Sequence, residues 1–523
     1  MKERNFVKSA SLLAFSTIIA KFIGACYRIP LANILGGEGM GLYQLVFPVF
    51  ALLITLSSGA VPSAVAIIVS RKKALNQNSG GAFISSLILI TTWGFLLSLL
   101  LIILSKHISV LQSTSKIQKS YVMIAPSVFF VSVISVYRGY FIGNQNMTPP
   151  AVSQITEAII KLTAGLALAK KFLKMGLEYA VMAAFLGITV SEIITLIILF
   201  ILSDNKKSIN SGISFAEFKA NTKEIASLTF PLMAGGIIIP LSLFFDSLII
   251  INMLNLNQSS VMSTIEYGLF SGAVSPLINL PVMLNLSLGV AVAPSLTAGK
   301  ICKDIQSIKE KCSTCLKIAL AVGTPFLLLF VFLADDLLKL LYPALPPEHI
   351  RTAAGLMRIE SLNIISLSMG QIITSLLQAL GKAFVPVKVL SVCVALKIIL
   401  NLALLPAMGI TGAAIASVAC FGIYALCNYL YLNNLIGKST AMVKNGSKIT
   451  LCGAIMSTTV FVMNSFLKKS WAIWPSLLSS AVVYALTLLA IGFFDENELK
   501  SLPLSAVWIK INKVFRRIRN AIT

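Results

Sequence analysis

The chain has 523 residues, of which 57% are hydrophobic and only 12% are charged, and its mean hydropathy is +0.89. A soluble domain carries about twice that share of charged residues, so the composition excludes a soluble enzyme or binding protein. The net charge of +23 would suit a nucleic-acid-binding protein, but the lysines and arginines cluster in segments between long apolar runs. We therefore expect no nucleic-acid partner and predict a polytopic membrane protein.

Apolar runs of about 18 or more residues recur along the chain, and each is long enough to cross a bilayer as a helix. Helices are expected because a spanning segment must satisfy its own backbone hydrogen bonds, and these runs are too long and uniform for barrel strands. The predicted fold class is all-α, with about fourteen transmembrane helices at 9–30, 42–69, 82–104, 121–142, 151–170, 178–202, 225–252, 266–294, 312–334, 357–380, 385–407, 411–432, 449–467 and 471–492.

The distribution of positive charge predicts the orientation of these helices. Most lysines and arginines outside the spans fall in alternate loops on the side of the N-terminus, and in the C-terminal segment 510–519. By the positive-inside rule, both termini are expected in the cytoplasm of a multi-pass protein of the cell membrane. The basic C-terminal segment is also expected to contact anionic membrane lipids.

A Pro-x10-Lys pattern occurs twice, from Pro150 to Lys161 and from Pro386 to Lys397. Each copy follows a short glycine-containing loop and precedes a Met-Gly pair. A repeat of this kind indicates a duplicated membrane unit, which is how many secondary transporters are built. The predicted organisation is an N-lobe of six helices (1–202), a cytoplasmic linker (203–224), a C-lobe of six helices (225–437), and two further helices with a basic cytoplasmic tail (438–523).

Ionisable residues inside the spans are the candidates for function, because a charge in the bilayer is costly unless it is paired or hydrated. In the first half of the chain they are Lys21, Arg28, Glu157, Lys161 and Glu192. In the second half they are Asp246, Glu266, Arg358, Glu360 and Lys397.

Lys21 and Arg28 are seven residues apart and so share one face of a helix. Neither has an acidic residue within one turn on its own helix. Cations on an inward face suit a diphosphate or carboxylate ligand, since Arg binds phosphate oxygens bidentately and Lys attracts them as a point charge. The alternative for Arg28 is that its side chain extends to the outer interface, because it lies near the end of its span.

Glu157 and Lys161 stand at i, i+4, so an ion pair within one helix is the structural alternative for them. Lys397 has a cysteine at the corresponding earlier position, and it needs water, a partner helix or a ligand. Asp246 is the acidic residue of the seventh span. The candidate substrate-binding residues are therefore Lys21, Arg28, Glu157, Lys161, Asp246 and Lys397.

Several motifs are missing from the sequence. It contains no HExxH, Walker A, GxSxG or GxGxxG pattern, so nucleotide hydrolysis and proteolysis are not expected. Cys312 and Cys315 form one CxxC pair near Cys302, but a zinc site would need a fourth ligand. We expect no cofactor, no metal and no catalytic residues, and hence a transporter rather than an enzyme.

The segment KFIGACYRIPLANILGGEGMGLYQ (21–44) resembles the polysaccharide-exporter branch of the MOP flippase superfamily, and in particular the stage V sporulation protein B group, which is related to lipid II flippases. The segments LQALGK (377–382), KIILN (397–401) and GITGAA (409–414) extend the resemblance over nearly the whole chain. It implies fourteen helices, two six-helix lobes in a V with two C-terminal helices, and outward movement of undecaprenyl-diphosphate-linked sugars by alternating access.

In lipid II flippases, basic residues on the first helix line the cavity, and Lys21 and Arg28 match them here. Those flippases also carry an acid early in helix 2 and an Arg on helix 8. This chain has Gly41-Leu42-Tyr43 near the first position and no basic residue from 267 to 294 for the second. The departure favours the sporulation branch or a related oligosaccharide flippase over a lipid II flippase in the strict sense.

The sequence thus predicts a flippase for a polyprenyl-diphosphate-linked saccharide, such as a peptidoglycan precursor, with cell-wall synthases as possible partners. A MATE-type drug/cation antiporter is the first alternative, and it would need acids in the N-lobe cavity; Glu157 and Asp246 keep it open. The second alternative is a non-transporting scaffold for cell-wall synthesis. Charges within the spans argue against a scaffold, which gains nothing from burying them.

Overall fold

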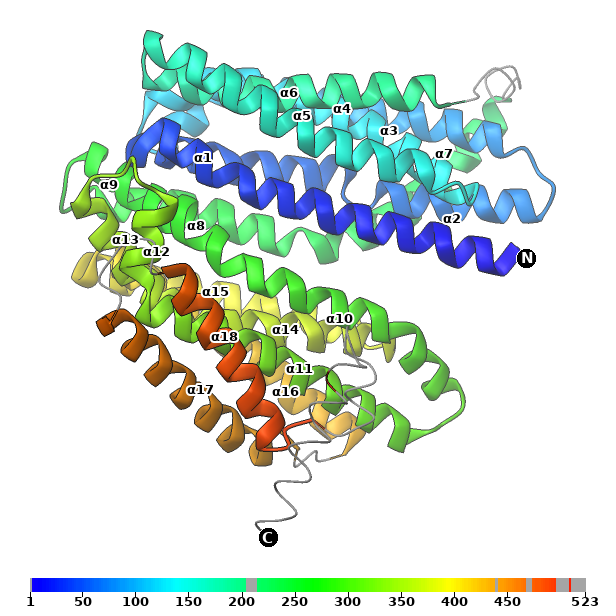
Figure 1. The fold of residues 1–523 in the computed structure, drawn as a ribbon. Coiled ribbons are helices and arrows are strands. Elements are labelled where there is room, and N and C mark those ends of the chain that lie inside the picture. Colours follow the sequence, from blue (N-terminus) through cyan, green and yellow to red (C-terminus); the bar gives the residue numbers. More distant parts are fainter. Residues whose placement is uncertain (1, 204–213, 438–440, 467–472, 495–507, 509–523) are drawn as a thin grey trace. The chain divides into compact units, whose positions relative to one another are not determined.

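A computed structural model describes residues 2–203, 214–437, 441–466, 473–494 and 508 of the chain. Every regular element among these residues is helical, which confirms the predicted all-α fold (Figure 1). In chain order, the elements are α1 (Lys2–Ser58), α2 (Val61–Ala74), α3 (Ser79–Leu111), η1 (Ser115–Ile117), α4 (Gln118–Gly143), α5 (Thr148–Phe172), η2 (Leu173–Met175), α6 (Leu177–Ile201), α7 (Phe215–Gly236), α8 (Ile238–Leu254), α9 (Ser260–Tyr267), the π-helical turn η3 (Gly268–Val274), α10 (Ser275–Ile301), α11 (Ile305–Phe332), α12 (Ala334–Leu341), α13 (Pro347–Glu360), α14 (Leu362–Ala379), α15 (Phe384–Met408), α16 (Ile410–Ile436), α17 (Ala441–Phe466) and α18 (Ile473–Ala490).

Within the described residues, 10 helical stretches are long and apolar enough to cross a membrane, and three shorter apolar helices accompany them. One of the long stretches, Ser11–Ala74, has 64 residues. That is more than twice the roughly 20 residues that one span needs, so it holds two spans. The protein is a multi-pass membrane protein, and the helices agree with the predicted set of about fourteen.

The first two predicted spans are joined differently from the connection that the sequence suggested. Helix α1 runs through the first and into the second, whose remainder lies in α2, and within α1 only Gly36 leaves the helical conformation, with φ 68° and ψ −172°. Glycine reaches this positive φ without the steric penalty of a side chain. One residue therefore redirects the chain where a loop between residues 30 and 42 was expected.

Local sequence signals account for where several helices begin. The side chain of Asn78 caps α3 by accepting a hydrogen bond from the backbone N–H of Gly81, and Asp304 caps α11 in the same way through Ser307. Capping satisfies backbone donors that have no partner inside the helix. Proline occupies the first turn of α2, α5 and α13, where its missing N–H costs nothing.

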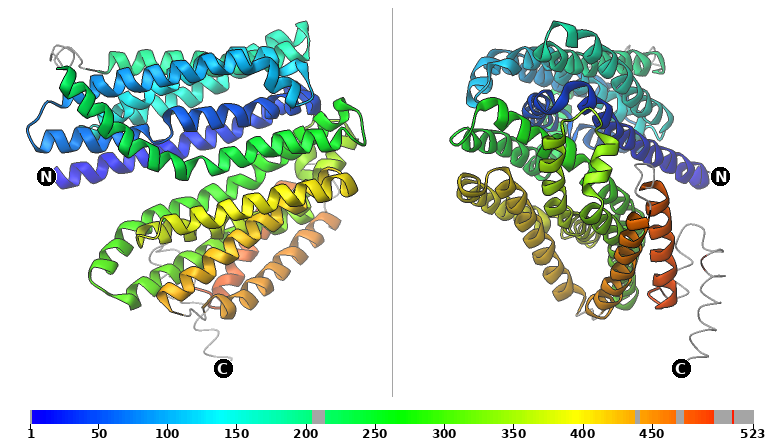
Figure 2. Two further views of the ribbon diagram at one scale, coloured as in Figure 1. Left: turned by 180° about the vertical axis from the view of Figure 1, so that it is seen from behind. Right: turned by 60° about the vertical axis from the view of Figure 1, so that its left-hand side comes forward.

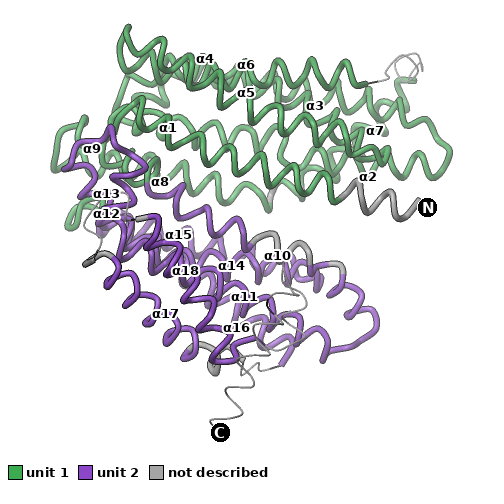
Figure 3. Tube along the Cα trace, viewed as in Figure 1, with its two compact units in different colours: residues 1–273, 405–410 green, residues 274–404, 411–523 purple. Residues whose placement is uncertain are grey.

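The chain divides into two compact units (Figure 3). Unit 1 comprises Met1–Ala273 and Leu405–Ile410, and unit 2 comprises Val274–Leu404 and Thr411–Thr523. The lobe boundary proposed from the sequence, between 202 and 225, stays a prediction; residues 204–213 of that linker lie outside the described residues, and α7 begins at Phe215. The basic segment 510–519 also lies outside the described residues.

In unit 1, α5 and α6 lie side by side, in views from both sides of the molecule (Figures 1 and 2). They approach closely at two glycines: a Cβ built on Gly187 would lie 2.5 Å from the Cα of Gly165. The two helices follow one another through a short turn and therefore run antiparallel. This contact consequently sets residue 161 of α5 opposite residues 191 and 192 of α6, which brings charged residues of the two helices together.

Unit 2 has its own core, formed by apolar residues of α10, α11, α14 and α16. Cys312 and Cys315 are both buried in it. The amide of Asn285 on α10 donates a hydrogen bond to the hydroxyl of Ser368 on α14, at 2.8 Å. The CxxC pair is thus part of the packing between helices, and no group of three or more metal-ligating side chains gathers anywhere in the described part of the chain.

Hydrogen bonds of a buried lysine and a buried asparagine connect α7 to α2 and α3 within unit 1. The ammonium of Lys72 donates to Oδ1 of Asn221 at 2.6 Å, and the amide of Asn221 donates to the hydroxyl of Ser85 at 3.2 Å. Beside them, Arg71 forms an ion pair of 2.5 Å with Glu224. Lys72 also lies 3.9 Å from a carboxylate oxygen of Glu217, and because Asn221 is buried, its Oδ1 relies on Lys72 as hydrogen-bond donor.

We expect Lys72→Met to lower the free energy of unfolding by about 1–3 kcal/mol, because it leaves the buried Asn221 oxygen without its donor. Lys73→Met is the matched control, because the side chain of Lys73 is exposed. Substitutions of exposed side chains change the free energy of unfolding by about 0.5 kcal/mol or less. Thermal unfolding of both variants in detergent provides the comparison. Equal melting temperatures would show that Lys72 does not stabilise this junction.

Candidate functional site

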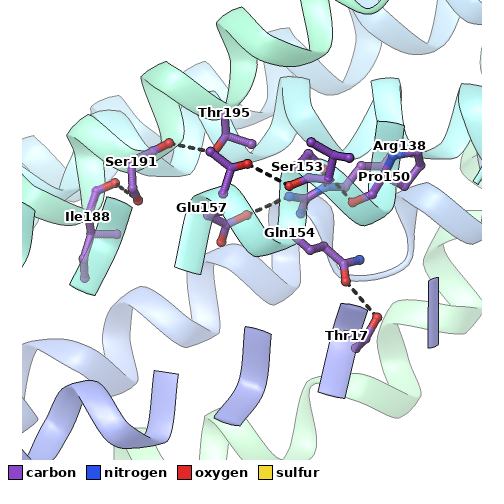
Figure 4. A network of polar contacts seen from close by, with 11 residues as sticks. Thr17, Arg138, Pro150, Ser153, Gln154, Glu157, Ile188, Ser191 and Thr195 are labelled. Carbon is purple, nitrogen blue, oxygen red and sulfur yellow. Dashed lines mark hydrogen bonds and ion pairs between the residues drawn. The ribbon is translucent and has the colours of Figure 1, made fainter. Parts of the chain in front are cut away.

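The centre of the candidate site is an ion pair between α4 and α5 of unit 1. The guanidinium of Arg138 donates from Nη2 to Oε2 of Glu157 at 2.7 Å and from Nε to the hydroxyl of Ser153 at 2.9 Å. Ser153 and Glu157 lie one turn apart on the same face of α5 (Figure 4). The arginine therefore spans one turn of the neighbouring helix.

A second pair of charges lies one further turn along α5 and on α6. Lys161 interacts electrostatically with Glu157, with Glu192 and with Arg28 of α1. Glu192 in turn interacts with Glu157, Arg138 and Lys161. These interactions connect five charged residues from α1, α4, α5 and α6 into one cluster, which we call the charge cluster: Arg28, Arg138, Glu157, Lys161 and Glu192.

Arg28 enters this cluster from α1. Its guanidinium carbon lies 4.9 Å from the centre of the Phe47 ring, within the range of a cation–π interaction. The adjoining Tyr27 is buried against Gly165 of α5, which aligns α1 with the part of α5 that carries Lys161. The contact with Phe47, on the same helix, places the guanidinium of Arg28 beside an aromatic ring of unit 1, and its role in binding stays a prediction.

The acids of the charge cluster differ in exposure. Glu157 has 27% of its side-chain surface exposed and its partner Arg138 has 17%, whereas Glu192 is only 4% exposed. Oε2 of Glu192 accepts no hydrogen bond from the described residues. The neighbouring hydroxyls of Ser191 and Thr195 donate instead to backbone carbonyls of their own helix.

Three cations and two carboxylates give the charge cluster a formal charge of +1. Part of its surface is open at Glu157, and the carboxyl group of Glu192 is buried behind it. A net positive site with arginine and lysine donors at low dielectric can bind an anion, and it suits phosphate oxygens in particular.

The other predicted site residues lie elsewhere. Lys21 is exposed on α1, more than one turn from Arg28. Asp246 is buried on α8, where it interacts electrostatically with Tyr267 of α9. Lys397 belongs to unit 2; it is 5% exposed and lies 5.7 Å from the centre of the Phe421 ring on α16. Among the predicted residues, the structure brings together Arg28, Glu157 and Lys161.

Sequence reasoning missed Arg138 and left Glu192 out of the site. Arg138 falls inside the predicted fourth span, so the rule that marks charges within spans also applies to it. Glu157, which was paired with Lys161 by its i, i+4 spacing, forms its ion pair with Arg138 on the preceding helix.

Comparison with known proteins identifies the family. The model of the family described as "Polysaccharide biosynthesis protein" matches residues 6–299, and that of MatE matches residues 231–403. The chain belongs to the polysaccharide biosynthesis protein family. This confirms the resemblance to the MOP superfamily and its relation to the lipid II flippases.

Two relatives from Bacillus subtilis (strain 168) align over most of this family member. Stage V sporulation protein B is 25% identical over 519 residues, which cover 96% of this chain and 99% of that protein. Lipid II flippase MurJ is 22% identical over 483 residues, covering 87% and 88%. Among solved structures, lipid II flippase MurJ in an inward closed conformation superposes with a TM-score of 0.70 at 16% identity, covering 92% of this chain and 98% of that one, so the two share a fold.

Proposed function

We propose that the protein is a flippase that moves a polyprenyl-diphosphate-linked saccharide across the cell membrane by alternating access. The observation that carries this proposal is the charge cluster, in which Arg28, Arg138 and Lys161 outnumber the two carboxylates inside a membrane-spanning unit. Charges at such depth are costly and are retained where a substrate uses them. A diphosphate is the part of a lipid-linked sugar that needs cationic partners.

We take the substrate to be a peptidoglycan precursor such as lipid II, with a role in the spore cortex as one form of this function. The printed names of the relatives support this choice: one is a sporulation protein, and another is a lipid II flippase. Cell-wall synthases would use the flipped product. Anionic lipids would hold the basic C-terminal segment at the cytoplasmic face, where we propose that both termini lie.

The residues divide the work as follows. Arg28 and Lys161 bind the phosphates, while the isoprenoid tail stays in the lipid. Lys21, exposed on the same helix as Arg28, offers a first contact for the anionic headgroup, and Lys397 and Asp246 act at a later stage of its path. A membrane potential or an ion gradient drives the movement.

The test is flipping of fluorescent undecaprenyl-diphosphate disaccharide-pentapeptide in proteoliposomes with the purified protein. We expect the label to become accessible on the opposite leaflet faster than in protein-free vesicles. The same lipid with its diphosphate replaced by a neutral linker should move at the background rate. Movement of both lipids at equal rates would argue against a site that recognises the diphosphate.

A MATE-type cation antiporter is the second candidate. It is favoured by the MatE match over residues 231–403 and by the two acids of the charge cluster, Glu157 and Glu192. An antiporter would export a cationic dye from vesicles against a proton or sodium gradient and would move no lipid. The sign of the cluster favours an anionic substrate over a cationic one.

A further inference from the structure

Glu157 has two cations within reach, and this is the starting point of a further inference. It forms an ion pair with Arg138 at 2.7 Å, and it interacts electrostatically with Lys161 one turn further along α5. Side chains at i and i+4 of a helix are neighbours that readily pair. The carboxylate can therefore exchange one cationic partner for the other by a change of rotamer, without leaving the charge cluster.

We propose that Glu157 is a resident counter-ion of Arg138, which the phosphates of the substrate displace. This inference rests on the proposed function. While the site is empty, Glu157 neutralises Arg138; when a diphosphate binds, Nη2 of Arg138 donates to the phosphates in place of Glu157, and Glu157 pairs with Lys161. Arg138 is in this way a further substrate-binding residue.

Exposure and hydrogen bonding favour Glu157 over Glu192 as the group that moves. Glu157 keeps 27% of its side-chain surface exposed, so a phosphate can approach the ion pair. Glu192, on α6, is buried, so a phosphate cannot approach it in the same way. Ser153, which is fully buried, holds Nε of Arg138 at 2.9 Å, so the guanidinium stays in position while its Nη2 exchanges partners.

The exchange explains how one site can both bind and release a diphosphate. Transport needs a site that takes up its substrate without holding it too tightly. A carboxylate that competes for Arg138 lowers the affinity and supplies a partner for the arginine as the substrate leaves. Competition of this kind works through differential contacts in two states, as a switch requires.

The experiment measures binding of farnesyl diphosphate, a short diphosphate probe, to the full-length protein in detergent. We expect Glu157→Gln to bind the probe about tenfold more tightly. The probe then no longer has to break the charge-assisted hydrogen bond between Arg138 and Glu157, and one such bond corresponds to about a tenfold change in affinity. Glu192→Gln is the matched control: it replaces the other carboxyl group of the cluster by an amide but leaves the pair of Arg138 and Glu157 intact. It should raise the affinity much less.

A double-mutant cycle tests the dependence on Arg138 itself. In an Arg138→Gln background, the further change Glu157→Gln should bring no gain in affinity, since the competition no longer exists. An equal gain with or without Arg138, or an equal gain in Glu192→Gln, would overturn the inference and leave a general effect of charge.

Failure of the inference is distinguishable from failure of the proposed function. If Arg28→Ala binds the probe as the wild type does, the diphosphate site itself is wrong. If Arg28→Ala loses binding but Glu157→Gln gains none, only the role of Glu157 as a counter-ion fails. Melting temperatures of all variants identify any that are misfolded.

Discussion

Arg28→Ala is expected to reduce flipping of the lipid-linked saccharide in proteoliposomes by a factor of ten to one hundred. The substitution removes a guanidinium that lies beside Phe47 and interacts with Lys161 inside unit 1. Charge-assisted hydrogen bonds contribute about 1.5–3 kcal/mol, which corresponds to roughly one to two orders of magnitude in binding or rate. The measurement is the initial rate of label transfer at equal amounts of reconstituted protein.

Two further variants make this expectation specific. Arg28→Lys keeps the charge but loses the bidentate geometry, so its rate should fall between those of the wild type and Arg28→Ala. Lys119→Ala removes an exposed lysine that pairs with Glu178 at the start of α6, and it should flip at close to the wild-type rate. If a stable Arg28→Ala protein flips the lipid at the wild-type rate, Arg28 is not part of the substrate-binding site.

The helices of this protein are largely predictable from sequence, because long apolar runs leave a spanning segment no other backbone structure. The junction of the two units is not predictable in this way. The chain first passes from unit 1 to unit 2 between Ala273 and Val274, inside one continuous apolar run, and Leu405–Ile410 belong to unit 1 again. The kink of α1 at Gly36 is also hidden, since a single residue with a changed φ leaves no pattern in composition.

The candidate site is predictable in part for a related reason. Spacing along one helix indicates that Glu157 and Lys161 are neighbours on α5 and that Arg28 shares a face of α1 with Lys21. It did not reveal that Arg138, 19 residues before Glu157, is the partner of that acid. Contacts between helices depend on how closely they approach, and here Gly165 and Gly187 set that distance.

A contact between backbones at a glycine is also expected to make one substitution strongly destabilising. The glycine, Gly41, lies in the segment 21–44 that resembles the MOP flippases. Gly41 of α1 packs against α9: a Cβ at this position would lie 1.9 Å from the backbone oxygen of Thr264. From the other side, a Cβ on Gly268 would lie 2.4 Å from the backbone nitrogen of Gly41. A rotamer change cannot relieve an overlap with backbone atoms.

Gly41→Ala is therefore expected to destabilise the protein by about 3 kcal/mol or more, because α1 and α9 have to move apart to admit one methyl group. Gly24→Ala is the matched control on the same helix, since no atom lies within 4 Å of the added Cβ. Alanine is the better helix former by about 1 kcal/mol, so this control should be as stable as the wild type or slightly more stable. Yield of monodisperse protein and melting temperature in detergent separate the two variants. A Gly41→Ala protein with the melting temperature of the wild type would mean that α1 and α9 do not approach at this glycine, and that the conformation of the segment, rather than its packing, is what the motif encodes.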